Sequence, residues 1–141
     1  MLVVRAVSAV HLSMNSKIDL SVVVPVYRSE KSLVELCERI LTASHALNVV
    51  PELILVDDCS PDKSWSVITQ LAEQYVPVRG IQLMANRGQG VATLCGLEQS
   101  TGDYIVTIDD DLQFAPEEIS NLWQRLQSDD CLLYTSPSPR D

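Results

Sequence analysis

Short apolar runs alternate with amphipathic segments along most of this chain. The first run, Leu20-Ser-Val-Val-Val-Pro-Val26, is rich in β-branched residues and too apolar for a strand with one solvated face. It predicts a strand buried on both faces, as in a parallel sheet, with Pro25 near its end. Three further runs are Leu53–Val56, Val78–Met84 and Tyr104–Ile108. Four strands alternating with three helices predict an α/β fold with a mostly parallel open sheet and flanking helices.

Local signals predict where the helices between these strands begin. Ser32, with Glu35 three residues later, forms a capping-box pattern ahead of apolar residues at helical spacing. Ser60-Pro61 offers an N-cap and a first-turn proline for the second helix, and the third is expected over Gln89–Gln99. Pro116, followed by two glutamates, predicts the acidic start of a fourth helix.

The charge and cysteine patterns limit the partners of this chain. Ten Lys and Arg against nineteen Asp and Glu give a formal net charge of −9, and the basic residues are scattered. We therefore expect no nucleic-acid binding. The four cysteines lack paired spacing, so they predict buried thiols in a reducing compartment rather than a zinc site or disulfides. No apolar run approaches the roughly 20 residues of a membrane-spanning helix, so membrane contact is expected only through a missing C-terminal part.

Both ends of the chain depart from the pattern of its middle. Residues 1–13 are apolar but lack the basic start of a secretory signal, so we expect a non-native or disordered extension before Met14. Residues 131–141 resemble the translation of a transposon-type sequencing adapter and contain Ser-Pro-Ser-Pro, which sustains neither a helix nor a central strand. We therefore expect residues 14–130, which end at Asp130, to be a truncated part of a longer domain.

Polar clusters follow three of the predicted strands. They are Asp57-Asp58, the Asn86–Gly90 loop and Asp109–Asp111. Ligands of open α/β sheets bind outside the carboxyl ends of the strands, so adjacent strand ends can bring these clusters into one cleft. An aspartate at a strand end is often a turn former or helix cap, so Asp57-Asp58 by itself indicates little.

Three consecutive carboxylates are harder to explain as turn residues. Two unit charges about 4 Å apart repel by roughly 4 kcal/mol at an effective dielectric of about 20, so the cluster either faces solvent or holds a cation. In an extended segment Asp109 and Asp111 point the same way and can face one ion, while Asp110 points away. Carboxylate oxygens suit Mg²⁺ or Mn²⁺, which share their coordination with substrate phosphates.

The Asn86–Gly90 loop resembles a phosphate cradle. Gly88 and Gly90 lack the third glycine of the dinucleotide fingerprint, and no Gly-Lys-Ser/Thr follows, which disfavours NAD and ATP. The glycines are equally consistent with a close strand–helix turn. Arg87 in this loop either reaches a diphosphate or is a solvated surface charge.

Four ordered motifs carry a family resemblance. They are Val24-Pro-Val-Tyr27, Leu55-Val-Asp-Asp-Cys-Ser-Pro-Asp62, Asn86 with Gly88 and Gly96, and Thr101-Gly-Asp-Tyr104 leading into Asp109-Asp-Asp-Leu-Gln113. In this order they resemble glycosyltransferase family 2, whose members have the GT-A fold with its Rossmann-like nucleotide-binding half. The Asp-x-Asp-Leu-Gln and Pro-Glu-Glu-Ile segments are most similar to polyprenol-phosphate sugar transferases, the group that includes dolichol-phosphate mannose synthases.

The resemblance implies an inverting, metal-dependent transfer of a sugar from a UDP- or GDP-linked donor to a polyprenyl phosphate. Such a step belongs to cell-wall or glycolipid biosynthesis, at the cytoplasmic face of a membrane. Acceptor and catalytic groups are expected beyond Asp130, so this fragment alone is expected to be inactive. By resemblance, Pro25, Tyr27, Asp57, Asp58 and Arg87 contact the nucleotide, Asp58 accepting a hydrogen bond from the base, while Asp109, Asp111 and Gln113 hold the metal and diphosphate.

Two alternatives and one departure remain at this stage. A family 2 enzyme can instead use a sugar or polysaccharide acceptor. A receiver-type phosphoacceptor domain also surrounds Mg²⁺ with strand-end acids, but its acidic pair normally ends the first strand, whereas Asp57-Asp58 ends the second. Relatives often have Asn-Glu after the tyrosine, where this chain has Arg28-Ser29, so one expected nucleotide contact is unassigned.

Overall fold

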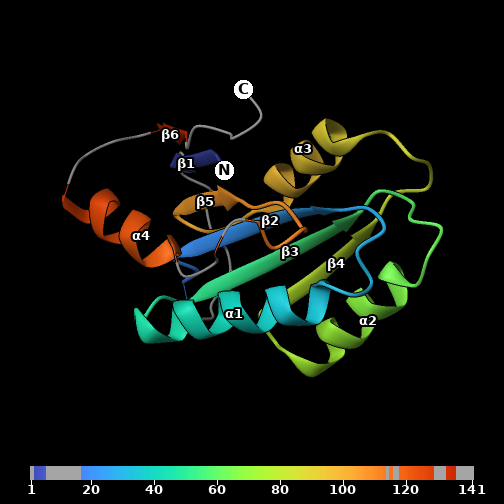
Figure 1. The fold of residues 1–141 in the computed structure, drawn as a ribbon. Coiled ribbons are helices and arrows are strands. Elements are labelled where there is room, and N and C mark those ends of the chain that lie inside the picture. The colour runs from blue at the N-terminus through green and yellow to red at the C-terminus, as the bar shows by residue number, and fades with distance from the viewer. Residues whose placement is uncertain (1, 6–16, 114, 116–117, 129–132, 136–141) are drawn as a thin grey trace.

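The strands form a single mixed sheet. The computed structural model describes residues 2–5, 17–113, 115, 118–128 and 133–135. Its strands are β1 Leu2–Arg5, β2 Leu20–Val26, β3 Pro51–Asp57, β4 Val78–Gln82, β5 Tyr104–Thr107 and β6 Leu133–Thr135. They lie in the order β4-β3-β2-β5-β1-β6 (Figure 1). β4, β3, β2 and β5 are parallel, and β1 and β6 are added antiparallel at one edge, which confirms the mostly parallel α/β prediction.

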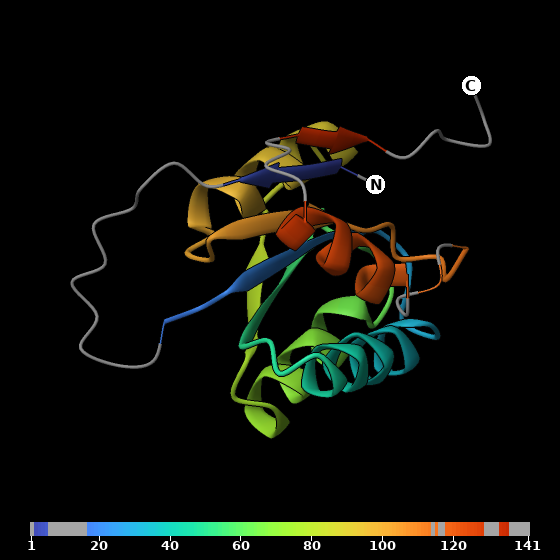
Figure 2. The same ribbon diagram turned by 90° about the vertical axis from the view of Figure 1, so that its left-hand side faces the viewer.

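Helices cover both faces of this sheet. The helices are α1 Leu33–Ala46, α2 Ser64–Gln74, α3 Gln89–Gln99 and α4 Glu118–Ser128. Figure 1 shows α1 and α2 on one face and α3 on the other, and Figure 2 shows α4 beside α1. β2 is buried along its whole length because alternate residues face opposite layers: Val22 and Val24 pack in the α1 layer, and Val23 packs in the α3 layer. The prediction of a doubly buried strand is therefore confirmed.

The order in which the chain adds strands reverses between β2 and β5. The chain runs from β2 outward to β3 and β4, then returns to place β5 on the other side of β2. β2 pairs with β5 only up to Val23 and Thr107, but with β3 up to Val26 and Asp57. Pro25 lies past the last β5 pair, where its missing N–H costs no ladder bond. Such a reversal of strand order is where open α/β sheets bind ligands.

The predicted start of α1 at Ser32 is confirmed, but its capping bond and the predicted start of α2 are wrong. Ser32 stands at the N-cap of α1, but no side-chain capping bond forms, because its hydroxyl donates to the carbonyls of Ser29 and Asp110. α2 begins at Ser64 rather than at Ser60-Pro61, because Asp62 accepts the Ser64 N–H at 2.9 Å and sets the helix start there. Burial by itself would raise the pKa of Asp62, but several hydrogen bonds, led by those from Ser64, together outweigh it and lower the pKa.

The two antiparallel strands, β1 and β6, were not predicted. The backbone of Leu2–Arg5 pairs with β5, and that of Leu133–Thr135 pairs with β1. Both fall in segments that the sequence analysis set apart, residues 1–13 and 131–141. Almost any sequence can form backbone hydrogen bonds in a sheet, so these pairings are consistent with either a native or a non-native origin of the two segments. The expected boundaries, Met14 and Asp130, both lie outside the described residues, so they stay predictions.

The cysteines differ in their surroundings. Cys37 is buried in α1, and burial, with the nearby Glu38 charge, raises its pKa to about 12. Cys95 is partly buried, but Cys59 is exposed, so the prediction of a buried thiol is wrong there. Cys131 lies outside the described residues. In the part of the chain that the structure describes, no helix is both long enough and apolar enough to cross a membrane.

Candidate functional site

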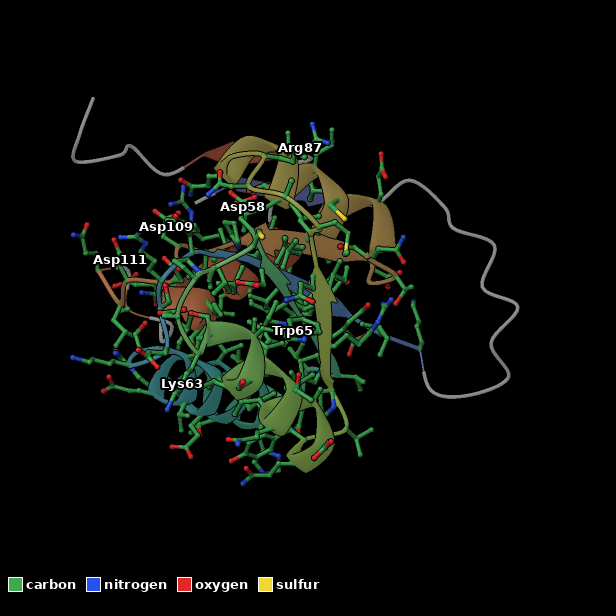
Figure 3. All side chains as sticks on the ribbon, turned by 90° about the vertical axis from the view of Figure 1, so that its right-hand side faces the viewer. Asp58, Lys63, Trp65, Arg87, Asp109 and Asp111 are labelled. Atoms are coloured by element: carbon green, nitrogen blue, oxygen red, sulfur yellow. The ribbon has the colours of Figure 1, made fainter. Side chains whose placement is uncertain are left out.

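A cleft of about 420 Å³ opens at the carboxyl ends of the parallel strands. Figure 3 looks onto this end of the molecule and labels Asp58, Asp109 and Asp111 there. The lining comes from the ends of β2 and β3, the loop before α3 and the acidic loop after β5. Its described members are Pro25, Val26, Tyr27, Asp58, Asn86, Gly88, Gln89, Asp109, Asp110 and Asp111. The prediction that the polar clusters meet in one cleft is therefore confirmed.

Asp58 joins the β3 end of the cleft to the loop before α3. Its side chain is only 4% exposed, and its two carboxylate oxygens accept the backbone N–H groups of Arg87 and Gly88 at 2.7 and 2.9 Å. Gly88 has φ +94°, a conformation that a side chain would strain. Each carboxylate oxygen has a second lone pair, so Asp58 can still accept one bond from a ligand in the cleft.

Tyr27 forms the β2 wall of the cleft. The residue is 41% exposed, and the Arg28 guanidinium lies 5.3 Å from the ring centroid. Arg28 has a left-handed backbone with φ 56°, and its N–H donates to the Ser60 hydroxyl at 3.0 Å. The exposed ring offers a flat surface against which a planar base can stack.

The three consecutive aspartates have different partners. Asp109 accepts the side-chain amide of Gln89 at 2.8 Å, and Asp111 accepts the backbone N–H of Gln113 at 3.1 Å. Asp110 instead accepts bonds from the turn between β2 and α1. All three aspartates line the cleft, and residues 110–111 form a turn rather than an extended segment, so the predicted direction of Asp110 away from the cleft is wrong.

Three residues of the predicted site lie outside the described lining of the cleft. The Asp57 side chain is fully buried and accepts the N–H of Ser60, so it serves the turn after β3. The Arg87 side chain is exposed and stands away from the three labelled aspartates in Figure 3; only its backbone N–H enters the site. Gln113 is also exposed, and its backbone supports Asp111.

The catalytic group of the expected transfer has no assigned residue. We expect it beyond Asp130, and Asp130 itself lies outside the described residues. The location of the catalytic group therefore stays a prediction, and none of the described side chains is given that role.

Sequence reasoning did not single out Gln89 or Asp110 as site residues. Gln89 opens α3, and its side chain crosses the cleft to Asp109. Asp110 lines the cleft from a position that alternation directs away from the predicted ion. The only sequence signal for either residue was its place in a loop after a parallel strand, which does not say where a side chain is directed.

The exposed aspartates fit a partial ligand set for a divalent cation. No group of three His, Cys, Asp or Glu side chains within the described ranges is arranged to hold a metal. Asp109 and Asp111 are both exposed on the cleft and supply hard oxygen atoms. Mg²⁺ and Mn²⁺ need about six ligands and commonly take only one or two from carboxylates, with water and substrate phosphates supplying the rest. The donor set therefore fits a cation that arrives with a diphosphate.

Fold and cleft together define a GT-A, Rossmann-like nucleotide-binding domain. The family model described as Glycosyl transferase family 2 matches residues 21–139. The chain belongs to this family, which decides against the receiver-domain alternative. The matched range includes residues 131–139.

The chain is also similar to curated undecaprenyl-phosphate sugar transferases. An undecaprenyl-phosphate 4-deoxy-4-formamido-L-arabinose transferase of Photorhabdus laumondii is 48% identical over 103 residues, which cover 72% of this chain and 32% of the relative. The transferase of the same description from Shewanella sediminis is 46% identical over 110 residues, covering 77% and 33%. This chain thus spans about a third of the length of these relatives.

Solved structures support the fold assignment. The structure of S. aureus TarS 1–349 in complex with UDP-GlcNAc is 26% identical with a TM-score of 0.66, over 79% of this chain and 32% of that one. The mannosyltransferase PcManGT from Pyrobaculum calidifontis, solved with GDP-Man and Mn²⁺, has a TM-score of 0.67 at 24% identity, covering 79% and 33%. At this identity, the likeness to PcManGT shows the shared fold alone.

Proposed function

We propose that the whole protein is a metal-dependent, inverting glycosyltransferase that moves a sugar from a nucleotide sugar to a polyprenyl phosphate. The observation that carries this proposal is the single cleft in which Tyr27 and Asp58 face the exposed pair Asp109 and Asp111. Two relatives that are 46% and 48% identical, both undecaprenyl-phosphate sugar transferases, support the acceptor class. A sugar or polysaccharide acceptor remains the alternative within the same family.

In this proposal the cleft binds the donor along its length. Pro25 and Tyr27 contact the nucleoside, and Asp58 uses a free lone pair toward the base while holding the loop before α3. Asp109 and Asp111 hold Mg²⁺ or Mn²⁺ against the diphosphate, with Gln113 behind Asp111. When bound, the cation neutralises charge on the departing nucleoside diphosphate. A nucleotide contact by the exposed Arg87 side chain would require the side chain to turn inward, and the buried position of Asp57 does not support such a contact.

The acceptor chemistry explains why a strong base is not needed. A lipid phosphate is already an anion, so its oxygen attacks the anomeric carbon directly. The new C–O bond forms as the bond to the nucleoside diphosphate breaks, and the electron pair leaves with the diphosphate. A sugar hydroxyl acceptor would instead need a general base. We place the acceptor site in the part of the protein beyond Asp130 and the whole enzyme at the cytoplasmic face of a membrane.

The donor half of this proposal is testable on the present chain. We expect UDP or GDP to raise its melting temperature in the presence of Mn²⁺ and not in the presence of EDTA. Asp111→Ala should weaken the binding of the nucleotide with Mn²⁺ by about tenfold or more, because it removes one of two exposed carboxylate ligands. Titration calorimetry measures the dissociation constant of the nucleotide with Mn²⁺ for the wild type and for Asp111→Ala.

A matched control separates charge at the cleft from charge elsewhere. Glu73 is exposed near the end of α2, away from the cleft, so Glu73→Ala should bind the nucleotide like the wild type. A folded wild-type chain with no Mn²⁺-dependent binding of either nucleotide would refute the proposed function. Unchanged binding by Asp111→Ala would refute only the metal assignment.

A further inference from the structure

Three hydrogen bonds from one turn converge on Asp110. The turn between β2 and α1, residues 27–32, donates the N–H of Tyr27 at 3.0 Å and the hydroxyl of Ser29 to the same carboxylate oxygen, Oδ2. The hydroxyl of Ser32 donates to the Asp110 carbonyl at 2.7 Å. Two segments about 80 residues apart in the chain are thus joined at one residue.

These bonds account for two departures from expectation. Ser32 gives up its cap of α1 because its hydroxyl is directed to the acidic loop. Ser29 belongs to the Arg28-Ser29 pair that left one expected nucleotide contact unassigned, and its hydroxyl donates to Asp110. The position whose expected nucleotide contact was unassigned is therefore used to hold the two loops together.

The joined segments form adjoining parts of the cleft lining. Tyr27 lies at one end of the turn, and Asp109 and Asp111 flank Asp110. Both segments contain a residue other than glycine in the left-handed region, Arg28 at φ 56° and Leu112 at φ 62°. Such conformations persist only where surrounding contacts hold them, and the bonds to Asp110 are contacts of that kind.

We propose that Asp110 is a positioning residue that fixes residues 27–32 to the acidic loop and so sets the distance between Tyr27 and the Asp109–Asp111 pair. It acts through backbone and hydroxyl donors and is not itself a metal ligand. The inference rests on the proposed function to the extent that its consequence is read as binding of a nucleotide with Mn²⁺. The bonds themselves can be tested without any nucleotide.

Two substitutions separate positioning from metal binding. In Asp110→Asn, the amide oxygen can replace Oδ2 as the acceptor for both donors, but the negative charge is lost. Asp110→Ala removes the acceptor and leaves the Tyr27 N–H without its partner. We expect Asp110→Ala to weaken binding of the nucleotide with Mn²⁺ by about tenfold or more and Asp110→Asn by no more than about threefold. Equal, large losses in both variants would identify Asp110 as a metal ligand and overturn the proposal.

A double-mutant cycle tests the bond from Ser29 directly. Ser29→Ala should weaken binding in the wild-type background and have no further effect in the Asp110→Ala background, because its partner is already gone. Additive losses would mean that the two side chains act independently, contrary to the proposal. Glu73→Ala serves as the surface control, and the melting temperature of each variant shows that the measured protein is folded.

Hydrogen exchange gives a readout that does not depend on nucleotide binding. In the free chain, the amide of Tyr27 should exchange faster in Asp110→Ala by about tenfold or more and stay protected in Asp110→Asn. Unchanged exchange in Asp110→Ala would overturn the positioning role whether or not the wild type binds a nucleotide. Faster exchange in a chain that binds neither UDP nor GDP would support the bonds and refute only the proposed function. If Asp110→Ala fails to fold, the same measurement on Asp110→Ser decides, because its shorter side chain also withdraws the acceptor from the Tyr27 N–H: faster exchange is the expected result and unchanged exchange is the refutation.

Discussion

Asp57 and Asp58 are chemically identical neighbours with different surroundings. Asp57 is the last residue of β3, and its buried carboxylate accepts the N–H of Ser60. Asp58 instead lines the cleft and accepts backbone N–H groups from the loop before α3. Successive residues leaving a strand point to opposite sides, so only one of the pair can face the cleft. The dipeptide is therefore one structural residue followed by one site residue.

We predict that Asp58→Asn destabilises the chain. An amide has one acceptor oxygen, so its NH₂ group would face one of the two backbone N–H donors of Arg87 and Gly88. Losing one charge-assisted bond at a buried position should lower the free energy of unfolding by about 1–3 kcal/mol. Urea denaturation measures this loss.

The control for Asp58→Asn is Glu73→Gln, the same loss of charge at an exposed position on α2. It should unfold at the wild-type urea concentration. Wild-type stability of Asp58→Asn would show that the two backbone bonds contribute little, and the role of Asp58 would then be confined to ligand contact.

At the scale of elements, α3 lies against the sheet through a glycine. A Cβ at Gly96 would stand 2.3 Å from Cγ1 of Val23 and 3.2 Å from Cγ2 of Val56. These two valines belong to β2 and β3 and are fully buried. The glycine therefore sets how closely α3 packs, and with it the position of Gln89 at the α3 start.

We predict opposite outcomes for two alanine substitutions in α3. Gly96→Ala should lower the free energy of unfolding by about 1–3 kcal/mol because the added methyl overpacks the core. Gly90→Ala meets no atom within 4 Å and should be neutral or stabilising by up to about 1 kcal/mol, since alanine favours the helix. Both values come from urea denaturation, and a stable Gly96→Ala would mean that α3 can shift without cost.

Over the whole molecule, the two ends of the sheet have different tasks. At the amino ends of the strands, the buried Glu52 carboxylate accepts bonds from Ser21, Thr101 and Arg79. The Gly102 N–H in turn donates to the Ser21 hydroxyl at 2.8 Å. These bonds join β2, β3, β4 and the turn before β5. The Thr101-Gly102 motif therefore serves the fold, at the opposite end from the cleft.

We predict that Glu52→Ala reduces stability without reducing affinity. Four donor groups on Ser21, Arg79 and Thr101 lose their acceptor, so the free energy of unfolding should fall by about 2–3 kcal/mol. Because the cleft lies at the other end of the strands, the folded variant should bind the nucleotide with Mn²⁺ as the wild type does. Denaturation and calorimetry on one preparation measure both quantities.

Lys17→Ala is the matched control at the same end of the sheet. It removes an exposed ion pair with Asp103 at 2.8 Å, and its unfolding midpoint should stay near that of the wild type. A loss of nucleotide affinity in folded Glu52→Ala would contradict the separation of the two ends.

The α/β class, the order of the elements and the strand ends that carry the site followed from the sequence alone. These features depend on local hydrophobic periodicity and on the direction of the chain, and both can be read from Leu20–Val26 and the segments that follow it. The family motifs added residue roles by resemblance, and Pro25, Tyr27, Asp58, Asp109 and Asp111 do line one cleft. The sequence missed β1 and β6 because runs of four and three residues carry too little pattern to mark a strand.

Only the tertiary structure decided which side chains turn toward the cleft and which partners they find. Ser32 bonds to a residue 78 positions away instead of capping its own helix. Asp110 accepts hydrogen bonds from residues 27–32, whereas Asp109 and Asp111 are exposed to solvent. No local pattern encodes such choices, because a hydroxyl or carboxylate bonds to whatever donor or acceptor the packed sheet brings within about 3 Å. The sequence by itself determined where the cleft lies, and packing determined how its walls are held.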